Sequence, residues 1–263
     1  MADSHLSTSA ATLHPEAEFS FRRAFMRHCR DSIRHYGLWH TIRQLSEAFY
    51  RFVRELLPDR RKATFGDLDY DWEHNVDTTR SNVSLRTQLL VAITAHQYFP
   101  SEPWLFEEIM QALPADKSNF TFIDLGSGKG RVLLMASQYG FERIIGVELV
   151  PEWHRVAAEN IAKFSAEHAA NKPITSICMD ARDFQFPAEP LVVYLFNPFP
   201  EPVLAAVMEH LRESVHDGTM DAFIAYRYLE FDHLFSSANW LEKVMGTDQW
   251  AVYKITPHAD PHR

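Results

Sequence analysis

The second half of the chain alternates between short apolar runs and segments with helical spacing. LVVYLF at 191–196 is an unbroken apolar run, which is typical of a strand buried on both faces of a sheet. Regular alternation of strands and helices predicts a three-layer α/β sandwich with a mostly parallel seven-stranded sheet. The predicted strands are 121–125, 143–149, 174–179, 191–196, 221–228, 240–245 and 249–255, and the predicted helices between them are 129–139, 152–170, 201–215 and 231–237.

A different pattern precedes the predicted sheet. Between residues 19 and 62, apolar side chains recur every three or four positions, first up to Tyr36 and again from Leu38 onward. This spacing predicts two amphipathic helices that are joined at Gly37 and end before Pro58. We expect the chain to begin its folded part with this helical region.

The same segment is strongly basic. Residues 19–62 hold eleven Lys or Arg and four Asp or Glu, a balance of +7, whereas the whole chain has a net charge of -9. We expect the apolar stripe of these helices to pack on the main domain as a cap, with the arginines in solvent. The alternative is a basic surface for an acidic partner, either nucleic acid or an anionic lipid surface, or for a protein.

These patterns divide the chain into five parts. A helix is predicted over 84–97, and Pro103 is expected to open another, because proline suits the first helical turn. The predicted parts are a disordered tail at 1–18, the basic helical region at 19–62, a connecting loop and helices acting as cap or lid at 63–119, the ligand-binding domain at 120–256, and a tail at 257–263.

Composition narrows the class of protein. With 46% hydrophobic and 23% charged residues, the chain is neither disordered nor collagen-like. The apolar runs are too short to span a membrane, and the N-terminus lacks a basic start followed by an apolar core. The two cysteines, Cys29 and Cys178, lie far apart and are expected to be reduced and buried, so we expect a cytoplasmic protein.

The turn after the first predicted strand carries the most chemical information. Residues 122–130 read FIDLGSGKG, and Glu148 ends the next strand, 22 positions after Gly126. Glycines let the backbone approach a ligand closely, and the following helix start offers free N–H groups. A carboxylate at this spacing can accept hydrogen bonds from both ribose hydroxyls. Together these features predict a ligand that contains adenosine.

The spacing of the glycines separates the possible ligands. A phosphate-binding loop would need glycine at Ile123 and a hydroxyl residue at Gly130. A dinucleotide fold prefers a third glycine one position later than Gly130. The pattern, with Asp124 two residues before the first glycine, instead resembles motif I of the class I S-adenosylmethionine-dependent methyltransferases, which are Rossmann-like. The resemblance covers about 120–255 and extends to the segments GVEL, CMDARDF and LFNPF.

The resemblance implies a role for each matching residue. S-adenosylmethionine would be the cofactor, and Glu148 would bind its ribose. Asp180 would accept a hydrogen bond from the adenine amino group, and the backbone N–H of Ala181 would face an adenine ring nitrogen. The methionine part would be held by Asp124, Gly126, Ser127, Gly128 and Gly130.

The end of the fourth predicted strand bears on the methyl acceptor. In this family, amino methyltransferases often carry Asn/Asp-Pro-Pro followed by an aromatic residue at this place. The chain reads Asn197-Pro198-Phe199, with one proline fewer, and these three residues are the predicted catalytic group. The DLGSGKG turn is also similar to that of seven-strand lysine methyltransferases. We expect in-line methyl transfer to a nitrogen of a protein lysine, an RNA base or a small amine.

Two other functions fit parts of the pattern. One is a nicotinamide-dependent oxidoreductase, against which the glycine spacing and Asp124 both argue. The other is a non-catalytic module that binds a partner through the basic helices. The chain contains no H-E-x-x-H segment, no cysteine pair with zinc spacing and no G-x-S-x-G element, so we expect neither a metal site nor a serine hydrolase.

Overall fold

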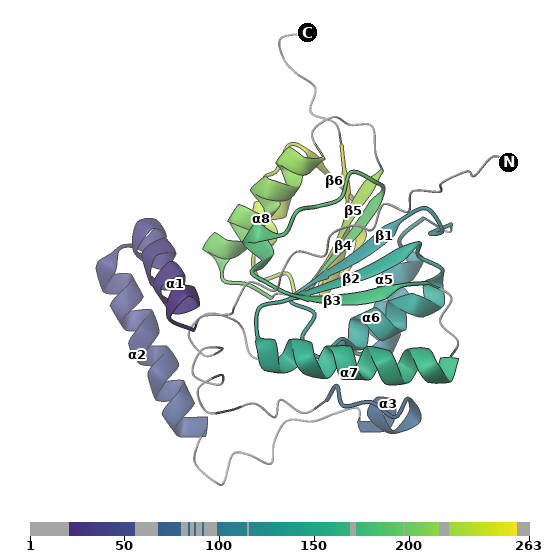
Figure 1. Cartoon of the computed structure of the whole chain (residues 1–263). Coiled ribbons are helices and arrows are strands. Elements are labelled where there is room, and N and C mark those ends of the chain that lie inside the picture. Colours follow the sequence, from purple (N-terminus) through teal and green to yellow (C-terminus); the bar gives the residue numbers. More distant parts are fainter. Residues whose placement is uncertain are drawn as a thin grey trace, which may run out of the picture.

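A computed structural model describes residues 21–55, 68–79, 84, 87, 91, 99–114, 116–168, 172–196, 198–215 and 221–256. Seven strands form one sheet in the order β3-β2-β1-β4-β5-β7-β6 (Figure 1). Neighbouring strands from β3 to β5 are parallel, and β7 is antiparallel to both β5 and β6. The predicted α/β sandwich with a mostly parallel seven-stranded sheet is therefore confirmed.

The strands match the apolar runs of the sequence. Leu191 to Leu195 in β4 are at most 1% exposed, because helices cover both faces of the sheet. The strands are β1 (Thr121–Leu125), β2 (Arg143–Glu148), β3 (Ile174–Cys178), β4 (Leu191–Phe196), β5 (Ala222–Arg227), β6 (Leu241–Gly246) and β7 (Trp250–Ile255).

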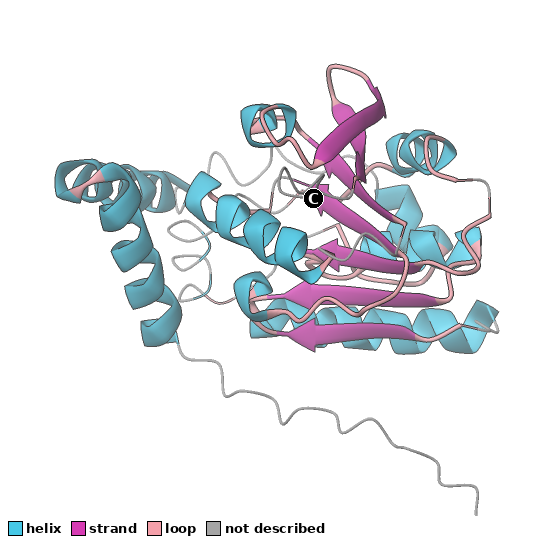
Figure 2. Ribbon diagram, turned by 90° about the horizontal axis from the view of Figure 1, so that it is seen from above, coloured by secondary structure: helices cyan, strands magenta, loops and turns pink. Residues whose placement is uncertain are grey.

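Two hydrophobic cores lie on the two faces of the sheet. Helices α5 (Pro103–Gln111), α6 (Arg131–Ala136) and α7 (Pro151–His168) cover one face, and α8 (Glu201–Ser214) and α9 (Asp232–Ser236) cover the other (Figure 2). Pro103 opens α5 as predicted. The helix after β1 is shorter than predicted, because α6 ends at Ala136 and a 3-10 turn, Ser137–Tyr139, follows it.

The basic region forms a hairpin of two helices. Helix α1 (Phe21–Tyr36) and helix α2 (Leu38–Glu55) are joined at Gly37, which has a φ of 85° that favours glycine. The hairpin lies beside the α/β body, with α1 nearer to it (Figure 1). The expectation that its apolar stripe packs on the main domain is wrong for α2, where Leu38 and Ile42 are 55% and 47% exposed. On α1 the stripe residue Tyr36 is half-buried and donates a hydrogen bond to Glu201 of α8 at 2.7 Å.

The segment before β1 is attached to the start of α6. Helix α3 (Leu68–Glu73) contributes Asp71, which accepts hydrogen bonds from the backbone N–H groups of Thr78 and Thr79 at 3.0 and 2.8 Å. Arg131 donates to both threonine hydroxyls, at 2.7 and 2.6 Å, and to Asp71 at 3.2 Å. The charged end of Arg131 also lies over the ring of Tyr70. This network holds the segment, predicted as part of a cap or lid, directly beside the glycine turn.

Several expectations lie outside the described residues. The two predicted tails are among them, and of the helix predicted over 84–97 only residues 84, 87 and 91 are described, the last two as helical. No helix among the described residues is long and apolar enough to cross a membrane. Both cysteines are free thiols and are half-buried rather than fully buried.

Candidate functional site

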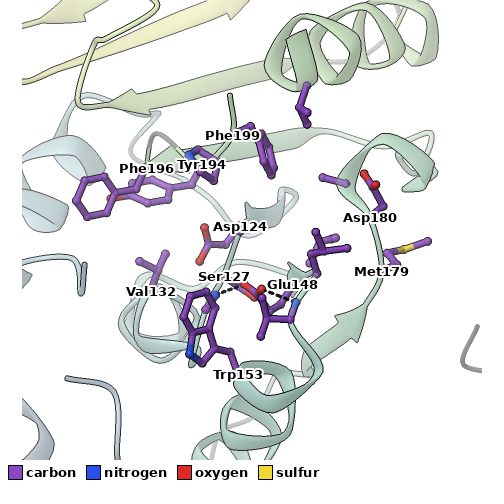
Figure 3. Close-up of a pocket in the computed structure, with 18 of the residues that line it drawn as sticks. Asp124, Ser127, Val132, Glu148, Trp153, Met179, Asp180, Tyr194, Phe196 and Phe199 are labelled. Carbon is purple, nitrogen blue, oxygen red and sulfur yellow. Dashed lines mark hydrogen bonds between the residues drawn. The ribbon is translucent and has the colours of Figure 1, made fainter. Parts of the chain in front are cut away.

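A pocket opens at the carboxyl ends of β1, β2 and β4, where parallel sheets bind ligands (Figure 3). Its floor is the glycine turn after β1, and its walls come from the end of β2, residues 179–182 after β3 and the end of β4. Ala24 and His28 of α1 also line it, so the N-terminal hairpin contributes to a pocket built mainly by residues more than 100 positions away.

The glycine turn requires glycine for two physical reasons. Gly126, Gly128 and Gly130 have φ angles of 84°, 54° and 86°, in the left-handed region that side chains disfavour. A Cβ on Gly126 would lie 2.4 Å from the Cβ of Pro198, closer than two such atoms can pack. The turn can therefore approach the end of β4 only because residue 126 has no side chain.

Glu148 holds this turn in place. One carboxylate oxygen accepts the Gly128 backbone N–H at 2.7 Å, and the other accepts the Val150 backbone N–H at 2.7 Å. Burial raises the pKa of Glu148 to about 7, although these hydrogen bonds act in the opposite direction. A carboxylate has about four lone-pair positions, so both oxygens keep the capacity to accept a ligand hydroxyl.

Asp124 and Ser127 present polar atoms in the same pocket. Asp124 is 3% exposed, and its burial, reinforced by the charge of Glu148, raises the pKa of Asp124 well above its ordinary value. The buried Ser127 hydroxyl has no hydrogen-bond partner among the residues that the structure describes. Buried polar atoms are rarely left without partners, so this hydroxyl favours a polar ligand in this part of the pocket.

The Asp180 carboxylate is tied to arginines. It accepts from the backbone N–H and the Nε of Arg182 at 3.0 and 2.9 Å, from the Nη2 of Arg182 at 2.6 Å, and from the Nη1 of Arg27 at 3.3 Å. Burial alone would raise the pKa of Asp180, but the hydrogen bonds and charge of Arg182, assisted by Arg27, hold it below its ordinary value. Ala181, next to it, is buried and lines the pocket.

Aromatic side chains form the wall opposite Glu148. Tyr194 and Phe196 from β4 and Phe199 after it lie along one side of the pocket above Asp124 (Figure 3), and Phe99 adds a fourth ring to the lining. Pro198 lines the pocket beside the glycine turn. Asn197 lies outside the described residues.

Several lining residues were not predicted from sequence. Tyr194 and Phe196 stand in a run that reads only as a buried strand, and no local pattern shows which of its side chains face the pocket. Arg182 could have been predicted from the segment CMDARDF, because a basic residue two positions after the predicted Asp180 can pair with its carboxylate. Nothing in the sequence indicated that Ala24 and His28 would reach the pocket.

The donor set fits S-adenosylmethionine. The glycine turn leaves a cradle that side chains would fill, the Ser127 hydroxyl needs a partner, and Glu148 has lone pairs for a diol. Asp124 supplies a buried carboxyl group, whose ionised form a ligand with a positive charge would favour.

Comparisons with known proteins agree with this geometry. Residues 123–199 match the family described as "Methyltransferase domain", which spans the glycine turn, Glu148, Asp180 and Phe199. No curated protein sequence matches the chain.

Solved structures similar to this chain include three methyltransferases. The ribosomal protein L11 methylase from Lactobacillus delbrueckii subsp. bulgaricus is 18% identical, with 59% of this chain and 77% of that chain covered and a TM-score of 0.41. An RNA methyltransferase from Salinibacter ruber in complex with S-adenosyl-L-homocysteine is 18% identical, with 62% and 97% covered and a TM-score of 0.41. The magnesium protoporphyrin IX methyltransferase from Synechocystis PCC 6803 with bound SAM is 10% identical, with 59% and 77% covered and a TM-score of 0.40.

The assignment of the family depends on the domain match together with what the chain itself contains. The matched segment carries the glycine turn at the end of β1, the acidic residue at the end of β2 and the aromatic segment at the end of β4. The chain therefore carries a methyltransferase domain, matched over residues 123–199 and built on the parallel part of the seven-stranded sheet.

Proposed function

We propose that this enzyme transfers the methyl group of S-adenosylmethionine to a nitrogen atom of a protein lysine, an RNA base or a small amine. The observation that carries the proposal is the aromatic wall of Tyr194, Phe196 and Phe199 beside the buried Asp124. Aromatic faces attract ammonium groups and also stack on flat bases, so they suit a nitrogen-bearing acceptor.

Each predicted cofactor residue has a proposed task. The glycine turn and Ser127 cradle the methionine part, Asp124 faces its ammonium group, and Glu148 accepts from the ribose hydroxyls. Asp180 accepts from the adenine amino group, beside the Ala181 backbone N–H. The location of these residues around one pocket supports the assignment, except for Gly130, which packs against Ala157 of α7 instead of lining the pocket.

The main contribution of the protein to the catalytic step is the alignment of the two reactants. The bound cofactor supplies a methyl group already activated on a sulfonium, so no covalent enzyme intermediate is required. The protein contributes by holding the acceptor nitrogen in line with that methyl group, which is worth on the order of 7 kcal/mol or more. Pro198 fixes the end of β4 against Gly126, and Phe199 offers its ring to the acceptor. Asn197 is proposed to accept a hydrogen bond from the acceptor nitrogen, which directs its lone pair.

A labelling experiment tests the acceptor class. Purified enzyme is incubated with cell extract and isotopically labelled S-adenosylmethionine, and the label is sorted into protein, RNA and small-molecule fractions. Mass spectrometry then identifies the methylated atom. We expect label on nitrogen, and a label found on oxygen or carbon contradicts the proposal.

Two variants connect the label to the site. Phe199→Ala should lower the transfer rate by about tenfold or more without loss of cofactor binding, since a stacking face contributes about 1–3 kcal/mol. The control is Trp104→Ala, which should leave the transfer rate unchanged because Trp104 is exposed. Phe186→Ala would not serve, since Phe186 is buried in the core. Equal rates for Phe199→Ala and the parent would remove Phe199 from the acceptor site.

The basic hairpin is the proposed docking place for an anionic partner. Residues 19–62 carry a balance of +7 on a chain with a net charge of -9, and the α1 side chains Arg22, Arg30 and Arg34 are exposed. Opposite charges raise the rate of encounter with such a partner. In this proposal the partner binds outside the cofactor pocket. Removal of the partner should therefore leave cofactor binding intact.

A further inference from the structure

The α1–α2 hairpin buries small and polar residues and exposes large apolar ones. Ser32, Thr41 and Ala48 are each 3% exposed or less. The Ser32 hydroxyl lies 2.8 Å from the Thr41 hydroxyl and donates to the side-chain carbonyl of Gln44 at 2.9 Å. In a hairpin surrounded only by water we expect the opposite arrangement, because burial of large apolar side chains is the main stabilising contribution.

The exposed side chains make up an apolar face. Met26 and Ile33 stand two turns apart on α1, which places them on one side of the helix, and they are 58% and 41% exposed. On α2, Leu38, Trp39 and Ile42 share one side at a spacing of three and four residues and are 55%, 82% and 47% exposed. We call these five residues the apolar face of the hairpin.

The α1 part of this face points away from the α/β body. Arg27 and Asp31 form ion pairs with residues of the body and mark the side of α1 that touches it. Met26 and Ile33 lie about 130° around the helix from that pair, at 100° per residue. The hairpin projects beside the body with α1 nearer to it (Figure 1), so the body does not cover the face.

Of the exposed α1 arginines, Arg22 lies on the side of Met26 and Ile33, at 100° per residue. Arg30 and Arg34 line a groove between α1 and the body, together with Arg182, Pro202 and Ala206. Arg22 and Arg34 are exposed and have no ion-pair partner among the residues that the structure describes. Arg30 lies 3.5 Å from the carboxylate of its neighbour Asp31, which also pairs with Arg182. The hairpin therefore combines exposed apolar side chains with positive charge that is not neutralised locally.

We propose that the α1–α2 hairpin docks on an anionic lipid bilayer, with the apolar face in the headgroup region and Arg22 against acidic headgroups. The inference rests on the anionic partner of the proposed function and narrows it to one chemistry. A bilayer with acidic lipids offers an apolar layer and negative charge together, which is what amphipathic helices of this composition bind.

Nucleic acid and a second copy each match only one half of the surface. Nucleic acid supplies phosphates but leaves the apolar face in water. A second copy docked face to face would bring Arg22 of both hairpins into one interface, and like charges repel. Since Ala24 and His28 of the same helix line the cofactor pocket, docking would also hold that pocket close to the membrane.

Co-sedimentation with vesicles tests the proposal on the full chain. Phosphatidylcholine vesicles with and without phosphatidylglycerol are compared at two salt concentrations, and an RNA oligomer is measured by anisotropy in the same buffers. We expect binding to the anionic vesicles only, weakened by salt. Equal binding to both kinds of vesicle, or binding to RNA alone, overturns the lipid assignment. Binding to none of these overturns the anionic partner as well.

Matched variants locate the surface. Trp39→Gln with Ile42→Gln should weaken vesicle binding about tenfold or more, since two buried apolar side chains are lost. The control is Trp72→Gln with Val244→Gln, whose residues are 90% and 46% exposed elsewhere on the molecule. Vesicle binding that is equal for the two double variants contradicts the proposal.

Charge variants complete the test. Arg22→Gln should weaken vesicle binding about 5-fold, and Lys163→Gln, exposed elsewhere, should not. Every variant should keep the rise in melting temperature caused by S-adenosylhomocysteine, which shows that it is folded and separates this test from that of the methyltransferase site. Light scattering that shows a dimer dissociated by the Trp39 variant would assign the face to a second copy instead.

Discussion

Glu148 and Asp180, the two carboxylates proposed to hold the nucleoside, are stabilised in opposite ways. Glu148 accepts two backbone N–H groups, those of Gly128 and Val150, and burial raises its pKa to about 7. Asp180 is held by the guanidinium groups of Arg182 and Arg27, which keep its pKa low. One carboxylate depends on local backbone dipoles and the other on charges, one of them brought from α1.

The difference affects what each end of the pocket can do. A buried carboxylate with a pKa near 7 changes its charge at neutral pH, so the ribose end should respond to pH. Asp180 stays ionised, and its four hydrogen bonds already use about four lone-pair positions. An adenine amino group would therefore compete with its weakest donor, Arg27 at 3.3 Å. The adenine end is linked to the position of α1 through this contact.

The largest expected effect comes from the glycine turn that Glu148 holds. Gly126→Ala places a Cβ 2.4 Å from that of Pro198, so the turn and the end of β4 must separate. We expect loss of the melting-temperature rise with S-adenosylhomocysteine and a methyl-transfer rate that is lower by about 100-fold or more.

Gly140→Ala is the control, because Gly140 has a φ of 78° but no atom within 4 Å of an added Cβ. It should cost about 1–2 kcal/mol of stability and keep the ligand response. A normal response in Gly126→Ala would mean that the turn is not part of the site.

Removal of Glu148 comes next in size. Glu148→Ala should weaken S-adenosylhomocysteine binding by roughly 1–3 kcal/mol, through lost hydrogen bonds. For the parent, affinity should fall as the pH falls through about 7, because the protonated carboxyl is a poorer acceptor. Calorimetric titration at several pH values measures both effects. Glu159→Ala, a change at an exposed carboxylate on α7, should behave like the parent. A pH-independent affinity in the parent would contradict the role of Glu148.

The same group predicts a pH dependence of stability without ligand. The pKa of Glu148 is raised from 4.5 to about 7 on folding, so its contribution is fully present below pH 4.5 and is lost as the pH rises through about 7. Relative to Glu148→Gln, the parent should therefore lose on the order of 5 °C in melting temperature across this window. Thermal unfolding of both proteins at pH 4.5 to 8 is the measurement. A constant difference between the two curves would show that the pKa is not raised.

The smallest effects are expected at the adenine end. Arg182→Gln removes two of the hydrogen bonds to Asp180 and should weaken S-adenosylhomocysteine binding about 3- to 10-fold. Arg27→Gln removes one long contact at a partly exposed site and should change affinity less than about 3-fold. Titration of the two variants side by side gives the comparison. A larger loss for Arg27→Gln would mean that α1 contributes more to the nucleoside site than the carboxylate network indicates.

Much of the sheet could be predicted because its signals are local. Strands buried on both faces, such as β4, need unbroken apolar runs, and the turn after β1 needs glycine wherever the backbone has a positive φ. Asp124 and Glu148 then follow from their positions at the ends of neighbouring parallel strands. Each of these residues is constrained by its immediate neighbours in the chain, so the sequence carries the information directly.

The hairpin shows where such reasoning fails. Periodicity showed that Leu38 and Ile42 share a helix side, but it led to the wrong expectation that this side packs on the main domain. Ser32 and Thr41, which have weaker apolar character, are the residues that face the partner helix. A stripe identifies the apolar side of a helix, and the surface that covers it depends on the placement of other elements.

Read alone, the chain determined the α/β architecture, the glycine turn and the order of its acidic residues, because strand burial and backbone conformation are set by adjacent side chains. Only the tertiary structure decided that Arg27 reaches Asp180, that Tyr194 lines the pocket and that the apolar face of the hairpin is exposed. These features join residues more than 100 positions apart or depend on which face of an element is covered, and no local pattern encodes such distances.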